Sequence, residues 1–212
     1  MEKKKMTWGR FCTIIFMLEV LLLMAFMTTD GVSRIMAMEG ISIENSLGTD
    51  ALKEIDKRAS ESFYELVVES GLYADLHKVM VPENKKPATS DIEKKGKGAV
   101  NWIEGRLNAW MYLLFQFLER VHLLVLWLPS SSLVFFACLY SGIALRMIKQ
   151  GNFAFSSPAA HRSGIRSIIF IVAMLPLYFL FPAPITPYLY PCLNIVWGFF
   201  LITIISNIAK RI

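Results

Sequence analysis

The side chains that could carry chemistry are few and scattered in this chain of 212 residues. Its three histidines, His77, His122 and His161, lie far apart, and the sequence holds no HExxH, CxxC or Gly-x-Ser-x-Gly motif and no phosphate-binding glycine loop. The three cysteines lie in or beside apolar segments, where thiols usually act as small buried hydrophobes. We therefore predict no catalytic site, no metal site and no cofactor, and we expect the chain not to be an enzyme.

Glu19 is the one acid inside an apolar stretch, where a carboxylate either serves a function or is neutralised by a hydrogen bond. Proton conduction would need a chain of such groups, and the sequence has none. We expect Glu19 instead to bond a neighbouring helix. The polar side chains predicted at a similar depth are Tyr140, Ser141 and Thr203.

Acidic residues are confined to one part of the sequence. Fifteen of the seventeen Asp and Glu lie within residues 29–119, and none lies between Arg120 and Ile212. A carboxylate costs about 2.5–3.5 kcal/mol at the centre of a bilayer, so an acid-free stretch of this length is typical of a membrane domain. The hydrophobic fraction of 55% and the mean hydropathy of +0.47 are also too high for an ordinary soluble chain.

Four apolar stretches are predicted to cross the membrane, since about 20 apolar residues span a bilayer core. The last two are joined by a proline-rich connection, residues 182–191, which predicts a rigid hairpin. An alternative with five spans divides the middle of the chain at Pro129, whereas the four-span topology has one span kinked there. The four predicted spans are Phe11–Met27, Val121–Leu145, Ser167–Phe181 and Leu189–Ile208.

Basic residues decide between these topologies. With four spans, all ten Lys and Arg that flank the spans lie on the cytoplasmic side, as the positive-inside rule requires. Five spans would place the loop between Lys149 and Arg166 and the C-terminal Lys210-Arg211 on the opposite side. We therefore predict a multi-pass protein of the bacterial inner membrane with both termini in the cytoplasm.

The predicted fold class is all-α: a polytopic integral membrane protein with four transmembrane helices and a small helical extracytoplasmic domain. Residues 1–28 form the cytoplasmic N-terminus and the first span, and residues 29–106 form a polar, helical periplasmic domain with a linker. Residues 107–212 form the membrane domain, which starts with an interfacial helix over Leu107–Leu118.

Helical periodicity within the polar domain predicts a helix from Thr49 to Gly71, with Thr49-Asp50 as its N-cap. Its apolar stripe is Leu52, Ile55, Ala59, Phe63, Leu66 and Val67. A second short helix is predicted from Leu72 to Met80. The segment Pro82–Gly98, with five lysines among Pro, Gly and Ser, is predicted to be a flexible basic linker.

A recognisable order of residues begins at Arg120. It continues with Trp127-Leu128-Pro129, Gly142, Arg146-Met147-Ile148, Phe153-Ala154-Phe155-Ser156-Ser157-Pro158, His161-Arg162 and Arg166. This order resembles a family of small inner-membrane proteins of unknown function from conjugative plasmids and integrating conjugative elements. Many members have Asp-Gly where this chain has Ser141-Gly142. The resemblance implies a role in conjugative DNA transfer, with the coupling ATPase of a type IV secretion system as partner.

The matching positions have physical explanations that need no catalysis. Pro129 interrupts a span beside three serines whose hydroxyls can bond the freed carbonyls, and Trp127 precedes it. Ser157 and Pro158 predict a helix start, with Pro158 as the first helical residue. A cytoplasmic basic surface is predicted to hold an acidic face of the ATPase or anionic phospholipid headgroups; it comprises Arg146, Lys149, Arg162 and Arg166.

Two further expectations concern partners. A homo-oligomer is compatible with the sequence, whereas direct binding of nucleic acid is not expected. The alternative function is an envelope sensor or exclusion factor that recognises a partner through its periplasmic domain.

Overall fold

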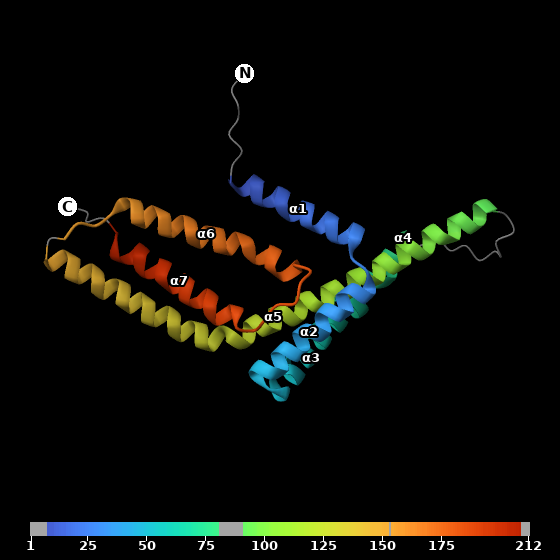
Figure 1. The fold of residues 1–212 in the computed structure, drawn as a ribbon, viewed down its shortest axis with the longest axis horizontal. Coiled ribbons are helices and arrows are strands. Elements are labelled where there is room, and N and C mark those ends of the chain that lie inside the picture. Colours follow the sequence, from blue (N-terminus) through green and yellow to red (C-terminus); the bar gives the residue numbers. More distant parts are fainter. Residues whose placement is uncertain (1–7, 81–90, 153, 209–212) are drawn as a thin grey trace, which may run out of the picture. The chain divides into compact units, whose positions relative to one another are not determined.

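The computed structural model describes residues 8–80, 91–152 and 154–208, which contain helices and no strand (Figure 1). The prediction of an all-α chain is confirmed. Several predicted flanking and linker residues, Lys3 to Lys5, Lys85, Lys86, Lys210 and Arg211, lie outside the described ranges. The helices are α1 (Trp8–Phe26), α2 (Thr29–Leu47), α3 (Thr49–Phe63), the π-helix η1 (Tyr64–Glu69), α4 (Leu72–Met80), α5 (Asp91–Gly151), α6 (Pro158–Leu180) and α7 (Leu189–Ser206).

The chain divides into two compact units. Unit 1 comprises Met1–His122 and Phe179–Thr186, and unit 2 comprises Leu123–Tyr178 and Pro187–Ile212. This division follows contacts within the chain and says nothing of compartments. The predicted segments 1–28, 29–106 and 107–212 therefore stay a prediction.

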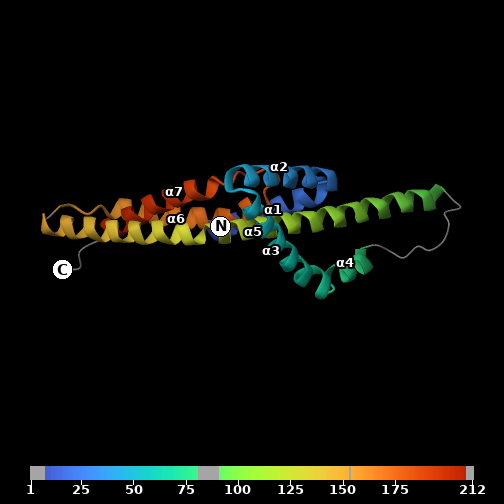
Figure 2. The ribbon, with the colours of Figure 1, turned by 90° about the horizontal axis from the view of Figure 1, so that it is seen from below.

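Helix α2 was not predicted from the sequence. Thr28 caps its start, since the Thr28 side-chain oxygen accepts a hydrogen bond from the Gly31 N–H at 3.2 Å. Its buried residues, Val32, Glu39 and Ile43, recur at helical spacing, and α2 packs against α3 (Figure 2). One apolar cluster of unit 1 combines α1, α2, α5 and the end of α6: Leu23, Met27, Val32, Met36, Leu113 and Leu180.

The predicted helix Thr49–Gly71 changes its winding part-way along. It is α-helical only to Phe63 and continues as the π-helix η1, so Leu66, predicted to be buried, is 52% exposed whereas Val67 is buried. The wider π turn shifts the buried face by a residue. The predicted N-cap is also wrong. Gly48, at φ 90°, holds that position, and the Thr49 hydroxyl donates to Glu44 Oε1 at 3.0 Å instead.

Gly71 ends this helix, because its φ of 73° is the left-handed conformation that glycine adopts at little cost. Helix α4 follows from Leu72 to Met80 and confirms the second helix predicted for the polar domain.

Helix α5 corrects two predictions. It runs unbroken over 61 residues, so the interfacial helix Leu107–Leu118 and the second span are parts of one helix. The linker predicted to end at Gly98 is helical from Asp91 onward. Extending an existing helix costs far less than starting one, which explains how Gly96 and Gly98 of the predicted linker are carried within α5.

Unit 2 is built from the second half of α5, α6 and α7, which lie as neighbouring rods in Figure 1. Small residues bring them close, as in many membrane bundles. A Cβ placed on Gly142 would lie 2.9 Å from the Ile205 Cβ, and one on Gly198 would lie 2.6 Å from the Cys138 Sγ. Gly142 therefore lies at a close contact between α5 and α7.

Among the described residues, three helices are long and apolar enough to cross a membrane by length and composition: residues Val100–Gly151 of α5, α6 and α7. The described apolar part of α1, Thr13–Leu23, is shorter. Large apolar side chains of unit 2 point outward and are more than 60% exposed, which water would disfavour and lipid would cover. They include Leu133, Phe136, Tyr140, Ile195 and Phe199.

Helix α5 continues through Pro129 without a break. Proline cannot donate to the Val125 carbonyl, and serine hydroxyls were predicted to replace the lost bond. They bond a carbonyl two residues later instead, because Ser130 and Ser131 both donate to the Trp127 carbonyl, at 2.9 and 2.7 Å. Ser131 Oγ also accepts a hydrogen bond from the Asn194 side chain of α7 at 2.7 Å, so Ser131 links α5 to α7.

Replacing Gly142 by Ala should destabilise unit 2 by about 1–3 kcal/mol, because the new methyl group would force α5 and α7 apart. Gly105→Ala is the matched control. A Cβ there meets no atom within 4 Å, so the better helix propensity of Ala should leave stability equal or raise it by up to about 1 kcal/mol. Thermal unfolding in detergent micelles measures both variants. Equal melting temperatures for Gly142→Ala and the parent would contradict the close contact.

Candidate functional site

The connection between α6 and α7 is short of backbone hydrogen-bond donors. Pro182, Pro184 and Pro187 have no backbone N–H, and the last carbonyls of α6 have no partner within the helix. Arg120 of α5 supplies the missing donors. Its two terminal nitrogens donate to the carbonyls of Phe179, Phe181 and Ala183, each at 2.9 Å.

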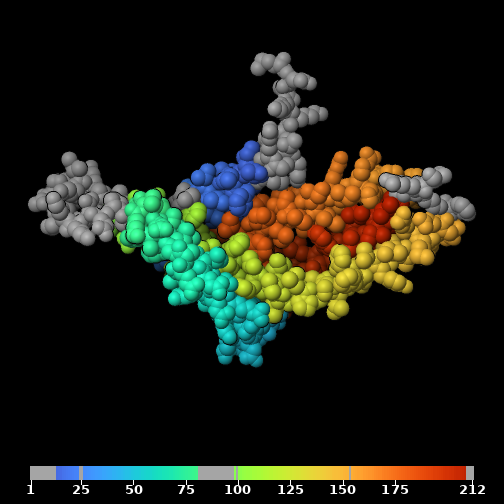
Figure 3. All heavy atoms as spheres, turned by 180° about the vertical axis from the view of Figure 1, so that it is seen from behind, coloured from blue at the N-terminus to red at the C-terminus, as the bar shows by residue number. Residues whose placement is uncertain are grey.

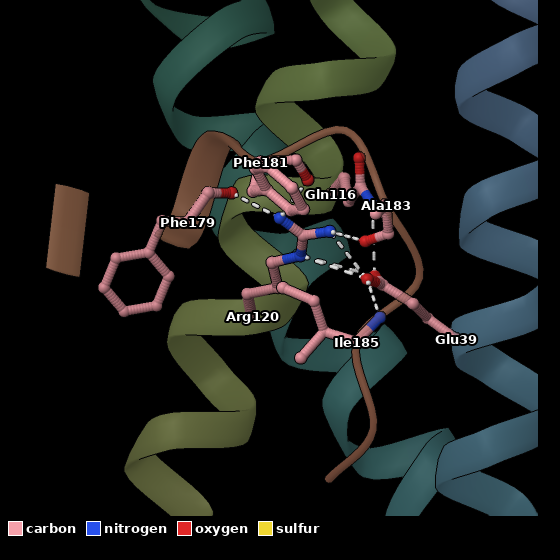
Figure 4. A network of polar contacts seen from close by, with 7 residues as sticks. All are labelled: Glu39, Gln116, Arg120, Phe179, Phe181, Ala183 and Ile185. Atoms are coloured by element: carbon pink, nitrogen blue, oxygen red, sulfur yellow. Dashed lines mark hydrogen bonds and ion pairs between the residues drawn. The ribbon is translucent and has the colours of Figure 1, made fainter. Parts of the chain in front are cut away.

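Glu39 of α2 balances the charge of Arg120. Its Oε1 accepts from Arg120 Nη2 at 2.6 Å and Nε at 3.2 Å, and from the Ile185 N–H at 2.9 Å. Gln116 donates to Glu39 Oε2 at 3.1 Å. Figure 4 shows these contacts, which we call the Glu39–Arg120 clasp: Glu39, Gln116, Arg120 and the backbone of residues 179–185.

The clasp is almost sealed from solvent, since Glu39, Gln116 and Arg120 are 5%, 1% and 3% exposed. A buried ion pair gains little over an apolar contact, but removal of one partner leaves a buried charge alone and costs about 3–5 kcal/mol. The clasp pairs Glu39 with Gln116 and Arg120, and Arg120 with backbone carbonyls. It is suited to fixing the proline-rich connection against α2 and α5.

Two pairs of polar side chains join α3 to α5 beside the clasp. The Asp56 and Glu119 carboxyl groups share a hydrogen bond, and Ser62 Oγ lies 3.0 Å from His122 Nε2. Burial, followed by the nearby charges of Asp56 and Glu39, raises the pKa of Glu119 from 4.5 to about 8. Glu119 lies outside the predicted span Val121–Leu145. At neutral pH the Glu119 carboxyl therefore stays protonated and donates a hydrogen bond to the Asp56 carboxylate.

The predicted basic residues gather where α5 ends, α6 begins and α7 ends. Asn207, only 8% exposed, holds these ends together, since its Oδ1 accepts from Lys149 Nζ at 3.0 Å and from the Ser157 N–H at 3.1 Å. His161 Nδ1 lies 2.9 Å from the Ile204 carbonyl and must carry the proton there. We call this part of unit 2 the basic end: Arg146, Lys149, Arg162 and Arg166.

Members of the basic end differ in their surroundings. Lys149 is engaged with Asn207, and the Nε of Arg146 is buried without a hydrogen bond among the described residues. Arg162 and Arg166 are exposed, and four residues apart on α6 they share one face. These two arginines are the ones accessible to a partner.

The remaining predicted positions are largely structural. Helix α6 begins at Pro158, and the Ser157 hydroxyl accepts from the Ala160 N–H at 3.3 Å, which confirms the predicted helix start. Glu19 Oε2 and Trp127 Nε1 are buried and have no hydrogen bond among the described residues. Ser141 and Thr203, expected near Glu19, donate to carbonyls of their own helices, those of Ala137 and Phe199.

Comparison with known families gives one match. A family model described as IncC plasmid conjugative DNA transfer protein DtrJ-like matches residues 14–208. The chain belongs to this DtrJ-like family. The match covers both units and confirms the resemblance found from Arg120 onward, and it implies that the chain takes part in conjugative DNA transfer. Searches of the curated proteins and of the solved structures give no match.

Among the residues that the structure describes, no three His, Cys, Asp or Glu side chains gather as a metal site would need. The absence of a catalytic role stays a prediction. Sequence reasoning missed the clasp, although a signal existed: Glu39 falls on the stripe Val32, Met36, Glu39, Ile43 of α2. An acid on an apolar stripe needs a buried cation as partner.

Arg120→Gln should destabilise unit 1 by about 3–5 kcal/mol, because Glu39 would keep a buried charge and three carbonyls would lose their hydrogen bonds from Arg120. Arg58→Gln is the matched control: it breaks the Arg58–Glu54 pair, whose side chains are 53% and 48% exposed, and should cost less than about 1 kcal/mol. Chemical unfolding of the purified protein measures both. Similar losses for the two variants would refute the structural role of the clasp.

Stability should fall as pH rises from 4.5 to about 8. The unfolded chain releases the Glu119 proton first in this window, while the folded chain retains it, so unfolding becomes more favourable with pH. Glu119→Gln keeps a donor for Asp56 without a titrating proton and should flatten this slope. Glu54→Gln removes a half-exposed carboxylate whose pKa the Arg58 hydrogen bond lowers below this range, so it should leave the slope unchanged. Melting temperatures measured over this pH range test the prediction. An equally steep fall of melting temperature with pH in Glu119→Gln would contradict it.

Proposed function

We propose that this chain is a noncatalytic inner-membrane component of the conjugative apparatus that docks the coupling ATPase. Membership of the DtrJ-like family indicates the process in which the chain acts, conjugative DNA transfer. The observation that carries the docking proposal is the basic end, where three helix ends meet within a 93-residue stretch that contains no acid. No carboxylate of that stretch can neutralise these charges, so they are available to an acidic partner.

Arg162 and Arg166 are the proposed contacts. A guanidinium group pairs with a carboxylate through two parallel hydrogen bonds, which the ammonium group of lysine cannot do. Anionic phospholipid headgroups are the competing partner and gain about 1 kcal/mol for each basic residue near the surface. The two partners are distinguished by whether the contact is needed for transfer or only adds to membrane affinity.

The proposed topology has four spans with both termini in the cytoplasm. Helices α6 and α7 and part of α5 have the length and composition of spans, and α1 is the proposed first span. This arrangement puts the basic end in the cytoplasm, where a coupling ATPase would lie, and residues 29–106 in the periplasm.

Reporter fusions should establish this topology. A cytoplasmic reporter should be active after Ile212 and after Asn152, whereas a reporter near Lys78 should be active only when it functions in the periplasm. Basic residues retained in the cytoplasm are the physical reason. An exported C-terminus would instead favour five spans.

Substituting Arg162 and Arg166 together by Gln should lower conjugative transfer at least about tenfold, equal to about 1.4 kcal/mol of docking free energy. The coupling ATPase should no longer co-purify, while the membrane level of the protein stays normal because its apolar helices are unchanged. Arg34→Gln with Lys53→Gln removes the same charge from exposed positions of unit 1 and should have no effect. Arg162→Lys in the parent background should lose part of the function.

Normal transfer by the correctly inserted Arg162→Gln, Arg166→Gln protein would indicate headgroup binding in place of docking. Deletion of the gene gives the baseline for complete loss of function. If the parent protein co-purifies an envelope protein and no ATPase, the alternative of a sensor or exclusion factor is favoured.

A further inference from the structure

Unit 1 contains an open pocket of about 390 Å³ that the clasp and the basic end do not use. Helices from three parts of the chain form its walls. Its most polar contact is already satisfied, since the Tyr73 hydroxyl donates to Asn108 Oδ1 at 3.2 Å. The pocket is therefore suited to an apolar group; it is lined by Phe63, Val67, Val68, Gly71, Tyr73, Ala74, Asn108, Met111 and Tyr112.

The π-helix explains why the pocket exists. The wider turns of η1 leave Val67 buried and Val68 53% exposed, and the left-handed Gly71 then redirects the chain into α4. Short π-helical segments often lie at functional sites, because they are less favourable than the α-helix they interrupt. Figure 3 shows the segment from α3 to α4, in cyan to green, at the surface.

The surface around the pocket is also apolar. Tyr64, Leu66, Leu72 and Tyr112 are all more than 40% exposed, and they belong to the same helices as the pocket walls. An exposed apolar patch of this kind marks a contact with another protein or with a membrane. A single small molecule in the pocket would leave most of the patch uncovered.

Charge distinguishes a protein partner from a membrane. Residues 59–76, which supply most of the walls, carry four acids and no Lys or Arg. All four, Glu61, Glu65, Glu69 and Asp75, are exposed. They would repel anionic headgroups and cannot enter a bilayer core at an acceptable cost. The same charges attract a basic segment.

We propose that this pocket docks an amphipathic helix of another protein, with a large apolar side chain in the pocket and Lys or Arg side chains near the four acids. Helices that bind a groove between helices present apolar anchors at i, i+3 and i+4, which matches the pocket and its apolar surroundings. This inference depends only on unit 1 and is independent of the coupling ATPase.

The test uses the full-length protein in nanodiscs of zwitterionic phosphatidylcholine and two fluorescent helical peptides of about 14 residues, or four turns. The peptides share one leucine stripe, and their other face carries either Lys or Glu. Fluorescence anisotropy should show at least about tenfold tighter binding of the Lys peptide. Empty nanodiscs give the background. Raising the salt concentration should weaken this binding, since the acids are exposed.

Ala74→Trp fills the pocket from an exposed position and should weaken binding of the Lys peptide at least about tenfold. Val68→Lys, also at an exposed position, should weaken binding to the same extent by placing a charge at the mouth of the pocket. Two independent variants are used so that misfolding of one does not leave the proposal untested. Glu65→Gln with Glu69→Gln should weaken binding several-fold and reduce its salt dependence. Met38→Trp, an exposed apolar position on α2 outside the pocket, should change nothing.

Equal binding of the Lys and Glu peptides, or unchanged binding by Ala74→Trp, would overturn the proposal. Two other occupants would also overturn it. Concentration-dependent self-association that Ala74→Trp abolishes would assign the pocket to a second copy of this chain. A phospholipid that co-purifies with the parent and not with Ala74→Trp would assign it to lipid.

Discussion

Missing backbone donors in the connection between α6 and α7 are the constraint on which unit 1 depends. Proline makes the turn rigid, but Pro182, Pro184 and Pro187 have no N–H to donate to nearby carbonyls, and the Ala183 N–H already bonds the Phe181 carbonyl. A guanidinium group has enough donors in a fixed plane to bond the carbonyls of Phe179, Phe181 and Ala183, which a lysine could not match. Once Arg120 is buried for this purpose, it requires a counter-charge, and Glu39 provides one while also accepting from the Ile185 N–H. The polar residues of the clasp therefore follow from the prolines.

In the part of the chain that the structure describes, the helices of unit 2 are held together by other contacts, without a buried ion pair. They approach closely at Gly142, Gly164 and Gly198, where any side chain would collide with the neighbouring helix. Their shared end is held by the neutral amide of Asn207, so no ion pair has to be buried there. This choice fits a unit with outward-facing apolar side chains, because the amide bonds the Lys149 ammonium group without adding a second charge that would have to be desolvated. The arginines that remain exposed are then free for recognition.

Much of this architecture follows from patterns that a sequence displays directly. The α6–α7 connection, the start of α6 at Pro158 and the short helix Leu72–Met80 depend on proline, capping residues and local periodicity, which are properties of neighbouring residues. Helix α2, the π-helix and the unbroken α5 escaped prediction because tertiary packing decides them: α2 has only a narrow buried stripe, and η1 still looks helical by spacing. The basic end could be predicted from the distribution of charge in the sequence, whereas the clasp could not. Glu39 and Arg120 are 81 residues apart, and no local rule pairs them.

The clasp also orders events during synthesis. Glu39 bonds the Ile185 N–H across 146 residues, so the ribosome must have made residue 185 before that contact can form. Until then unit 1 holds an acid and an arginine whose backbone partners do not yet exist. Unit 1 therefore cannot close its polar interior before the connection between α6 and α7 has been made, although most of its helices come much earlier in the chain.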